Sequence, residues 1–258
     1  RAPQSQSYMW VRRGGPPDQP AILFDYEPSR GGSVPARLLE GFQGILQTDG
    51  YEGYAGVAKR NDIIWVGCLA HVRRKYDEAL KAQKKKGCGG LAKQGFDFIQ
   101  RIYRVEREAR ERGLDADQRK ALRDKKASPI WDELRQWLDS VHGQVSPQSL
   151  TGKALNYTQA QWPRLIRTLD DGRIEVDNNH CENAIRPFVL GRKAWLFADT
   201  PAGATASARL SSLIETAKAN GLEPYAYLSQ VFEELPAAVV AEDEDAITRL
   251  LPWNIVEE

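Results

Sequence analysis

The amino-acid pattern changes character near residue 70. Residues 8–68 alternate short, β-prone apolar runs with turns, whereas residues 71–169 repeat apolar side chains at helical spacing. Roughly 100 residues of helix after a strand-rich start is unusual for a domain built on one sheet. We therefore expect an α/β protein that carries a large helical insertion.

The first part of the chain predicts a sheet. The turn residues Gly14-Gly15-Pro16-Pro17-Asp18 separate two β-prone runs and indicate a hairpin, and Asp49-Gly50 closes a third run. The expected elements are strands at 8–13, 21–26, 44–48 and 63–68 and helices at 34–42 and 51–60. Their β-β-α-β-α-β order indicates a mixed sheet with helices packed on it.

Several classes of protein are excluded by composition and motifs. No apolar run approaches the roughly 20 residues of a membrane-spanning helix, and the N-terminus has no secretory signal. Three cysteines are too few for a disulfide framework and suit a reducing cytoplasm. No GxxxxGK(S/T), GxGxxG or GxSxG motif occurs, so nucleotide-binding and hydrolase functions lack support. Because residue 1 is not Met, we interpret the chain as part of a longer protein.

The net charge of +1 hides a strong asymmetry along the chain. Residues 71–126 carry 18 basic and 9 acidic side chains, whereas residues 127–258 carry 11 basic and 19 acidic ones. Such a basic block can follow a phosphate backbone. It is equally consistent with a solvated helical face on which Glu and Arg pair, so charge alone leaves both interpretations open.

Two carboxylates stand out by position. Asp49 ends a strand that we expect to be buried, and sites in open α/β sheets lie at the carboxyl ends of strands. Glu182 lies in a polar cluster that begins at Asp177, and Arg186 follows it by one helical turn. Each also has a purely structural interpretation, because Asp favours turns and an acid near a helix N-terminus interacts well with the dipole.

Zinc is a further possibility that we weigh against the spacing. Cys68 and His71 have a ligand-like spacing, and His180-Cys181 offers a second pair. Adjacent ligands rarely fit one tetrahedron, and no CxxC occurs, so the sequence disfavours zinc. His71 is better interpreted as a residue that caps the strand-to-helix turn or contacts phosphate.

Taken together, several blocks resemble the transposases of the insertion-sequence 66 family, and they run in order over nearly the whole chain. The matching blocks include Leu46-Gln47-Thr48-Asp49-Gly50-Tyr51, Gly67-Cys68-Leu69-Ala70-His71, Asp177-Asn178-Asn179 with Glu182, Ile185-Arg186-Pro187, Gly191-Arg192-Lys193 and Leu250-Leu251-Pro252-Trp253. The resemblance implies a ribonuclease-H-like α/β fold, with a mixed sheet, a large helical insertion and a helical C-terminal extension. The implied boundaries are 1–75 for the first part of the core, 76–170 for the insertion, 171–220 for the rest of the core and 221–258 for the extension.

The resemblance also implies an Asp-Asp-Glu triad in a DDE-type enzyme. Asp49 matches the second Asp and Glu182 the Glu, while the family's first Asp lies upstream of residue 1. We therefore expect this chain alone to be inactive. In the complete site the two carboxylates would hold two Mg²⁺ or Mn²⁺ ions, which prefer oxygen ligands.

The implied partner is double-stranded DNA, both transposon ends and target, bound by an oligomer in the bacterial cytoplasm and not by a membrane protein. The expected DNA-binding residues are His71, Arg73, Arg74, Lys75, Lys84, Lys85, Lys86, Arg186, Arg192 and Lys193. The alternative function is a catalytically incomplete module that holds DNA with its basic helices. The sequence does not specify the DNA ends or the target preference.

Overall fold

A computed structural model describes residues 6–82, 90–195 and 200–255, and of residues 192–195 it describes the backbone alone. The chain forms two compact units. One, here called the hairpin unit, comprises residues 1–34 and 179–258, and the other, the bundle unit, comprises residues 35–178. The short helix α1 (Ser33–Leu38) spans the first boundary between them.

The hairpin unit is built on two antiparallel strands, β1 (Tyr8–Gly14) and β2 (Ala21–Glu27), in which Val11 lies opposite Phe24. The turn needs glycine at position 15. Gly15 has a φ of +92°, and a Cβ there would lie 2.2 Å from the carbonyl oxygen of Gln19. The hairpin expected from the turn residues is thus confirmed.

Helix α9 (Pro201–Ala219) covers the free edge of β2 in the hairpin unit. The Thr216 hydroxyl accepts from the Ile22 N–H and donates to its carbonyl, both at 3.0 Å, and Ser212 accepts from the Phe24 N–H at 2.8 Å. Small side chains at helical spacing let this helix approach the strand closely, namely Ala204, Ala208, Ser212 and Thr216. Helix α8 (Asn179–Trp195) packs on β1. The edge of β2 would otherwise expose unpaired backbone groups, and α9 covers it.

The C-terminal part of the hairpin unit is helical. Gly221, at φ +83°, follows α9, and the chain continues as α10 (Pro224–Val240), α11 (Glu244–Arg249) and η4 (Pro252–Asn254). A small core of Ala217, Leu222, Tyr227 and Val231 joins α9 to α10. The Tyr227 hydroxyl donates to the Leu250 carbonyl at 3.2 Å, which ties the end of the chain back to α10.

The bundle unit begins with a parallel strand pair, β3 (Gly44–Gln47) and β4 (Ile63–Val66), with Gln47 opposite Val66. The short helices η1 (Glu52–Tyr54) and α2 (Ala55–Ala58) form the crossover between the strands. Because the strands are parallel, their carboxyl ends lie at the same edge. The residues that follow β3 and β4 are therefore neighbours.

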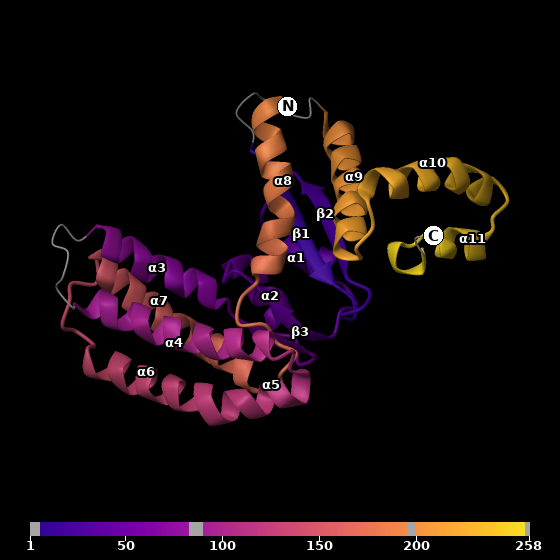
Figure 1. Ribbon diagram of the computed structural model, residues 1–258. Helices are drawn as coiled ribbons and strands as arrows, with labels where there is room; N and C mark the ends of the chain where they lie inside the picture. Colours follow the sequence, from indigo (N-terminus) through magenta and orange to yellow (C-terminus); the bar gives the residue numbers. More distant parts are fainter. Residues whose placement is uncertain (1–5, 83–89, 196–199, 256–258) are drawn as a thin grey trace. The chain divides into compact units, whose positions relative to one another are not determined.

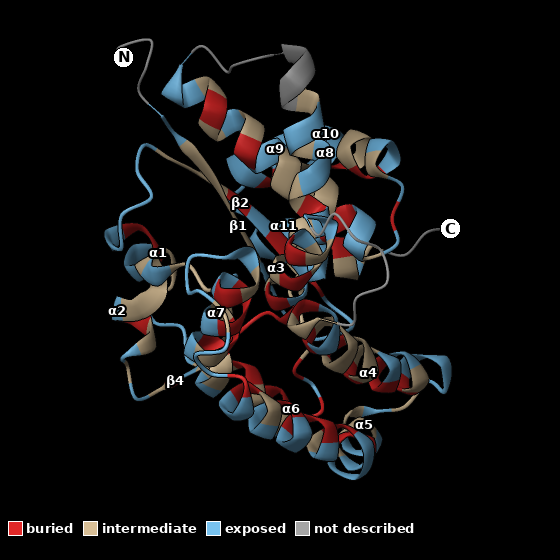
Figure 2. Ribbon diagram, turned by 90° about the vertical axis from the view of Figure 1, so that its left-hand side faces the viewer, coloured by how far each residue is buried: buried red, intermediate tan, exposed pale blue. Residues whose placement is uncertain are grey.

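Helices make up the rest of the bundle unit, and α3, α4, α6 and α7 lie side by side (Figure 1). The helices are α3 (Leu69–Lys81), α4 (Leu91–Glu111), α5 (Ala116–Leu122), the π-helical η2 (Arg123–Ala127), α6 (Ser128–Ser140), α7 (Leu150–Leu165) and η3 (Ile166–Leu169). Buried residues follow one side of α4 and α6, and exposed residues follow the other side (Figure 2). The helical periodicity of residues 71–169 is thus confirmed.

An ion pair is buried inside this bundle. Arg123 and Glu106 have side chains that are 1% and 3% exposed, and they meet at 2.7 and 2.8 Å. The same guanidinium donates to the carbonyls of Thr168, Asp171 and Ile174. Its five hydrogen bonds satisfy the buried charge and fix the segment that follows η3.

The ribonuclease-H-like mixed sheet expected from the resemblance is wrong for the part of the chain that the structure describes. Its strands form two separate sheets of two strands each, β1 with β2 and β3 with β4, and the structure is mostly helical. The strands do not join into one sheet because their edges are covered or because they are short. The backbone groups of β2 that a further strand would need are bonded to hydroxyls of α9, and β3 and β4 are four residues long.

Candidate functional site

Asp49 lies just beyond the carboxyl end of β3, with Thr48 between them, and β3 is half-buried and not fully buried as the sequence predicts. Its side chain is exposed, and Oδ1 accepts a 3.0 Å hydrogen bond from the Tyr51 N–H, which fixes the turn. Gly50, at φ +82°, permits the turn, since a Cβ there would lie 3.0 Å from the Tyr157 hydroxyl. The turn thus presents the Asp49 carboxylate at the surface in a defined conformation.

Tyr157 of α7 supports this turn. Its hydroxyl donates to the Asp49 carbonyl at 3.3 Å, and the Lys75 ammonium lies 5.3 Å from the centre of its ring. Burial raises the pKa of Tyr157 to about 12, so the hydroxyl stays protonated at neutral pH and remains a donor. The carboxyl end of β3 is thereby joined to α3 and α7.

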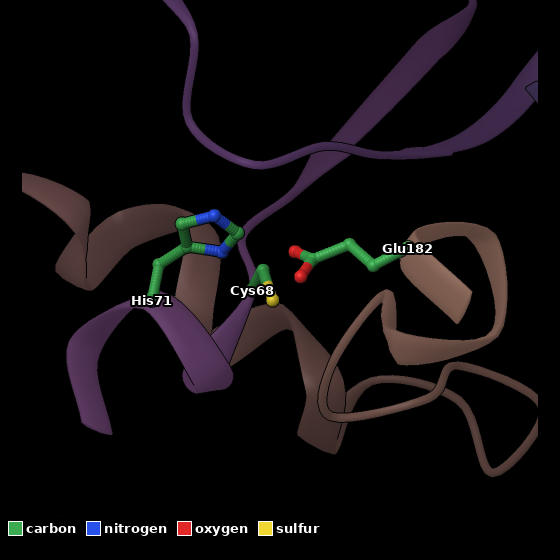
Figure 3. A group of neighbouring side chains, drawn as sticks. All are labelled: Cys68, His71 and Glu182. Carbon is green, nitrogen blue, oxygen red and sulfur yellow. The ribbon is translucent and has the colours of Figure 1, made fainter. Parts of the chain in front are cut away.

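The carboxyl end of β4 leads into α3 through Cys68, and His71 stands in the first turn of that helix. Figure 3 shows both side chains on this turn, and it also draws Glu182 on α8. A ring nitrogen of His71 lies within 4.8 Å of the Cys68 sulfur. Burial raises the pKa of the Cys68 thiol to about 11, so the thiol is protonated at neutral pH.

The motif Asp177-Asn178 is held at the same edge of the bundle unit. The Cys68 thiol donates to Oδ1 of Asn178 at 2.9 Å, and the Tyr103 hydroxyl donates to Oδ2 of Asp177 at 2.7 Å. Burial and the bond to Asp177 raise the pKa of Tyr103. The Arg73 guanidinium lies 5.6 Å from the centre of the Tyr103 ring. Residues from β4, α3 and α4 therefore converge on this motif.

The expected DNA-binding residues on α3 differ in their surroundings. Arg74 is exposed, His71 and Lys75 are half-buried, and Arg73 stacks on Tyr103 and on Phe96. Arg74 and Lys75 are one turn beyond His71, so the three share one side of the helix that starts at the carboxyl edge of the sheet.

The remaining basic block is largely neutralised. Eight basic side chains of residues 71–126 form ion pairs in the described part of the chain, seven of them with partners at or near the surface. They are Lys81, Lys93, Arg101, Arg112, Arg119, Lys120, Arg123 and Lys126. The structure therefore favours the solvated, paired helical face over a continuous phosphate-binding surface for these positions.

Glu182 stands in the first turn of α8, and Arg186 follows it one turn later with an exposed side chain. Glu182 belongs to the hairpin unit, whereas Asp49 belongs to the bundle unit. Of the other expected DNA-binding residues, Lys84, Lys85 and Lys86 lie outside the described residues, as do the side chains of Arg192 and Lys193.

Sequence reasoning missed Tyr103 and Tyr157 as parts of this edge. Both tyrosines lie in segments with helical periodicity, which predicts only that their rings pack in a core. The hydroxyl of Tyr103 binds a residue 74 positions away and that of Tyr157 a residue 108 positions away, and no local sequence pattern indicates such distant partners. The one local indication of this part of the site is the Asp177-Asn178 motif, in which two adjacent polar residues follow the buried Val176.

Comparisons with known proteins identify the family of this chain. The family model described as the transposase IS66 family matches residues 1–206, and the model of the IS66 C-terminal element matches residues 212–253. The chain belongs to the IS66 transposase family. The resemblance carried by the Asp49, Cys68 and Glu182 blocks is thereby confirmed at the level of the family.

The chain is also similar to proteins from Sinorhizobium fredii. The uncharacterized protein y4qI is 35% identical over 97% of this chain, and the uncharacterized protein y4jD is 34% identical over 92% of it. The chain spans 47% and 46% of the length of these two relatives. No solved structure matches it. None of the described helices is both long and apolar enough to cross a membrane.

Proposed function

We propose that this chain carries catalytic carboxylates of a DDE-type DNA transposase, which cleaves a phosphodiester bond and then joins a DNA 3′-hydroxyl to a target strand. Membership of the IS66 family supports the transposase role. The observation that carries the proposal is Asp49, an exposed carboxylate fixed by a turn at the carboxyl end of a parallel strand.

The donor chemistry fits the divalent metal ions that the family implies. Asp49 and Glu182 offer carboxylate oxygens, the ligands that Mg²⁺ and Mn²⁺ prefer, and Asp49 is open to solvent. In this proposal each residue binds one of two ions, and an upstream Asp completes the set. When bound, such a pair of ions stabilises the charge on the attacking and leaving oxygens of an in-line displacement.

The chain's own residues then bind and orient DNA. Lys75 of α3 contacts the ring of Tyr157, whose hydroxyl binds the Asp49 carbonyl, and Arg74 precedes Lys75 on the same helix. In this proposal both bind phosphates on either side of the scissile bond. His71, one turn earlier, contacts the same backbone. The protein acts as an oligomer on paired DNA ends in the bacterial cytoplasm, where its target is the nucleoid.

A cleavage assay with the full gene product tests this proposal. In the presence of Mg²⁺ or Mn²⁺, the wild-type protein should cleave DNA that carries the ends of the element. Addition of EDTA should stop the cleavage. Asp49→Asn and Glu182→Gln should each lower the rate at least about 100-fold, because direct ligands matter no less than the outer-shell groups that support them. The DNA dissociation constant should stay within about twofold.

Glu52→Gln is the matched control, since Glu52 is an exposed carboxylate three residues after Asp49 and pairs only distantly with Arg164, at 3.6 Å. It should cleave as wild type. If Asp49→Asn and Glu182→Gln also cleave as wild type, the proposal is wrong. If the protein binds DNA but never cleaves it, the binding-module alternative is the better account.

A further inference from the structure

We infer that Tyr103 and Cys68 are positioning residues that act through the turn Asp177-Asn178 on the helix bearing Glu182. The inference rests on the proposed function for Glu182, and it adds two residues that never touch metal or DNA. Asn178 is the last residue of the bundle unit, and α8 starts at Asn179. Whatever holds Asp177 and Asn178 therefore fixes the point from which α8 leaves the bundle.

Tyr103 makes a short hydrogen bond to the side chain of Asp177. Its hydroxyl donates to Oδ2 of Asp177 at 2.7 Å, the length of a strong bond from a hydroxyl to a carboxylate. Tyr103 lies on α4 and packs against the bundle core, so its hydroxyl has a rigid base. The Arg73 guanidinium 5.6 Å from the ring centre restricts the ring further.

Cys68 holds the second residue of the turn in two ways. Its thiol donates to Oδ1 of Asn178 at 2.9 Å, and its sulfur lies 3.4 Å from the Asn178 backbone nitrogen, which donates to it. Cys68 is 4% exposed and is the N-cap residue of α3, two residues after the end of β4, so it too stands on fixed backbone. The substitution Cys68→Ala would remove both hydrogen bonds to Asn178 while keeping most of the volume of the side chain.

The chain just before the turn is anchored as well. The Val176 carbonyl accepts from the Leu69 N–H at 2.9 Å, and the Glu175 carbonyl accepts from the Gln47 amide at 2.7 Å. Ile174 and Val176 are buried. The contacts of Tyr103 and Cys68 are thus the last in a series that runs along residues 174–178 to the end of the bundle unit.

Positioning matters here because metal-assisted displacement depends on geometry. A misplacement of about 1 Å in a reacting group can cost 100-fold in rate, and functional side chains need support from groups behind them. Loosening the turn before α8 should therefore reduce the catalytic rate while leaving DNA binding intact.

Amide hydrogen exchange tests the anchoring without any activity. In Tyr103→Phe, which keeps the ring, and in Cys68→Ala, amides of residues 183–186, the first that can donate within α8, should exchange roughly five- to tenfold faster than in wild type, as expected for the loss of one buried hydrogen bond. Cys68→Ser should restore the wild-type rate, because a hydroxyl both donates and accepts.

Tyr76→Phe is the matched control. It removes the hydroxyl that accepts from Thr158 at 3.2 Å in the bundle core, away from the turn. Amides of residues 183–186 in this variant should exchange as in wild type. Unchanged exchange in both Tyr103→Phe and Cys68→Ala, with the proteins folded by circular dichroism, overturns the inference.

Kinetics of the full gene product separate this inference from the proposed function. Tyr103→Phe and Cys68→Ala should lower kcat roughly tenfold with KM for DNA within about twofold, and Cys68→Ser should recover kcat. If Glu182→Gln is inactive but Tyr103→Phe and Cys68→Ala keep the wild-type kcat, the positioning role is wrong and the function stands. If wild type shows no metal-dependent cleavage, the proposed function fails, and the exchange rates still decide the anchoring.

Discussion

Arg123 and Glu106 form a bidentate ion pair in the interior of the bundle unit, with Nε and Nη2 of Arg123 at 2.7 and 2.8 Å from the two carboxylate oxygens. The remaining donors of Arg123 bind three carbonyls of residues 168–174. This pair joins α4 and η2 to the chain that leads to Asp177, so it links the stability of the bundle to the candidate site.

Breaking this pair on one side should strongly destabilise the protein. Glu106→Gln leaves the Arg123 charge buried without its counter-charge, which typically costs about 3–5 kcal/mol. Urea unfolding followed by circular dichroism measures the change. Asp97→Asn, which removes an exposed partner of Lys93 on the same helix, should cost less than about 1 kcal/mol. Equal effects of the two substitutions would contradict this account of the bundle.

The stability of the chain should fall in alkaline solution because of Cys68. Burial raises the pKa of this thiol from 9.0 to about 11. The unfolded chain loses the proton near pH 9, whereas the folded chain keeps it until about pH 11, so the stabilisation is complete below pH 9 and is lost as the pH rises between the two values.

The expected loss from Cys68 over this range is about 2–3 kcal/mol, from two pKa units. Urea unfolding at about pH 8 and about pH 10.5 should show about 2 kcal/mol of this loss, because pH 10.5 is still below the pKa of the folded state. In Cys68→Ser the side chain at position 68 does not titrate in this range. The stability of this variant should therefore change less than that of the wild type between the two pH values. A wild-type protein and a Cys68→Ser variant with the same pH dependence would refute the assignment.

Thr216 should be essential for the hairpin unit. Its hydroxyl both accepts from the Ile22 N–H and donates to the Ile22 carbonyl, and it is buried. Thr216→Val keeps the shape but leaves two buried backbone groups without partners, at a cost of about 1–3 kcal/mol each. Thr205→Val, on the same helix, removes only a bond to the Pro201 carbonyl and should cost less. Thermal unfolding distinguishes the two, and a Thr216→Val protein as stable as Thr205→Val would exclude this role.

DNA binding should depend on α3 more than on the rest of the basic block. Arg74→Gln and Lys75→Gln should each reduce the slope of log K against log salt by about 1, as for the loss of one phosphate contact. Arg101→Gln should change the slope less, because Arg101 is paired with Glu133 at 2.6 Å. Fluorescence anisotropy at several salt concentrations gives the slopes. Equal slopes in all variants would argue against α3 as the contact.

The sequence was sufficient for elements with local signals. The hairpin follows from Gly15 and its neighbours, the helices from 3.6-residue periodicity, and the exposed turn at Asp49 from Asp-Gly after an apolar run. Each signal lies within a few residues of the structure that it specifies, so a single sequence carries it.

What the sequence did not reveal depends on partners far along the chain. The mixed sheet was wrong because Ser212 and Thr216 occupy the edge of β2, and no local pattern shows that a helix 188 or more residues later covers a strand. The basic block is neutralised by pairs such as Arg101 with Glu133 and Arg119 with Glu175, which only the fold brings together.

The most direct test of the central claim is a crystal structure of the full gene product soaked with Mn²⁺, with the metal located by anomalous scattering. The proposal predicts manganese bound by carboxylate oxygens of Asp49 and Glu182, at about 2.1 Å for ions of this class. Manganese bound by neither carboxylate, or no bound manganese in a protein that cleaves DNA in Mn²⁺, would contradict it.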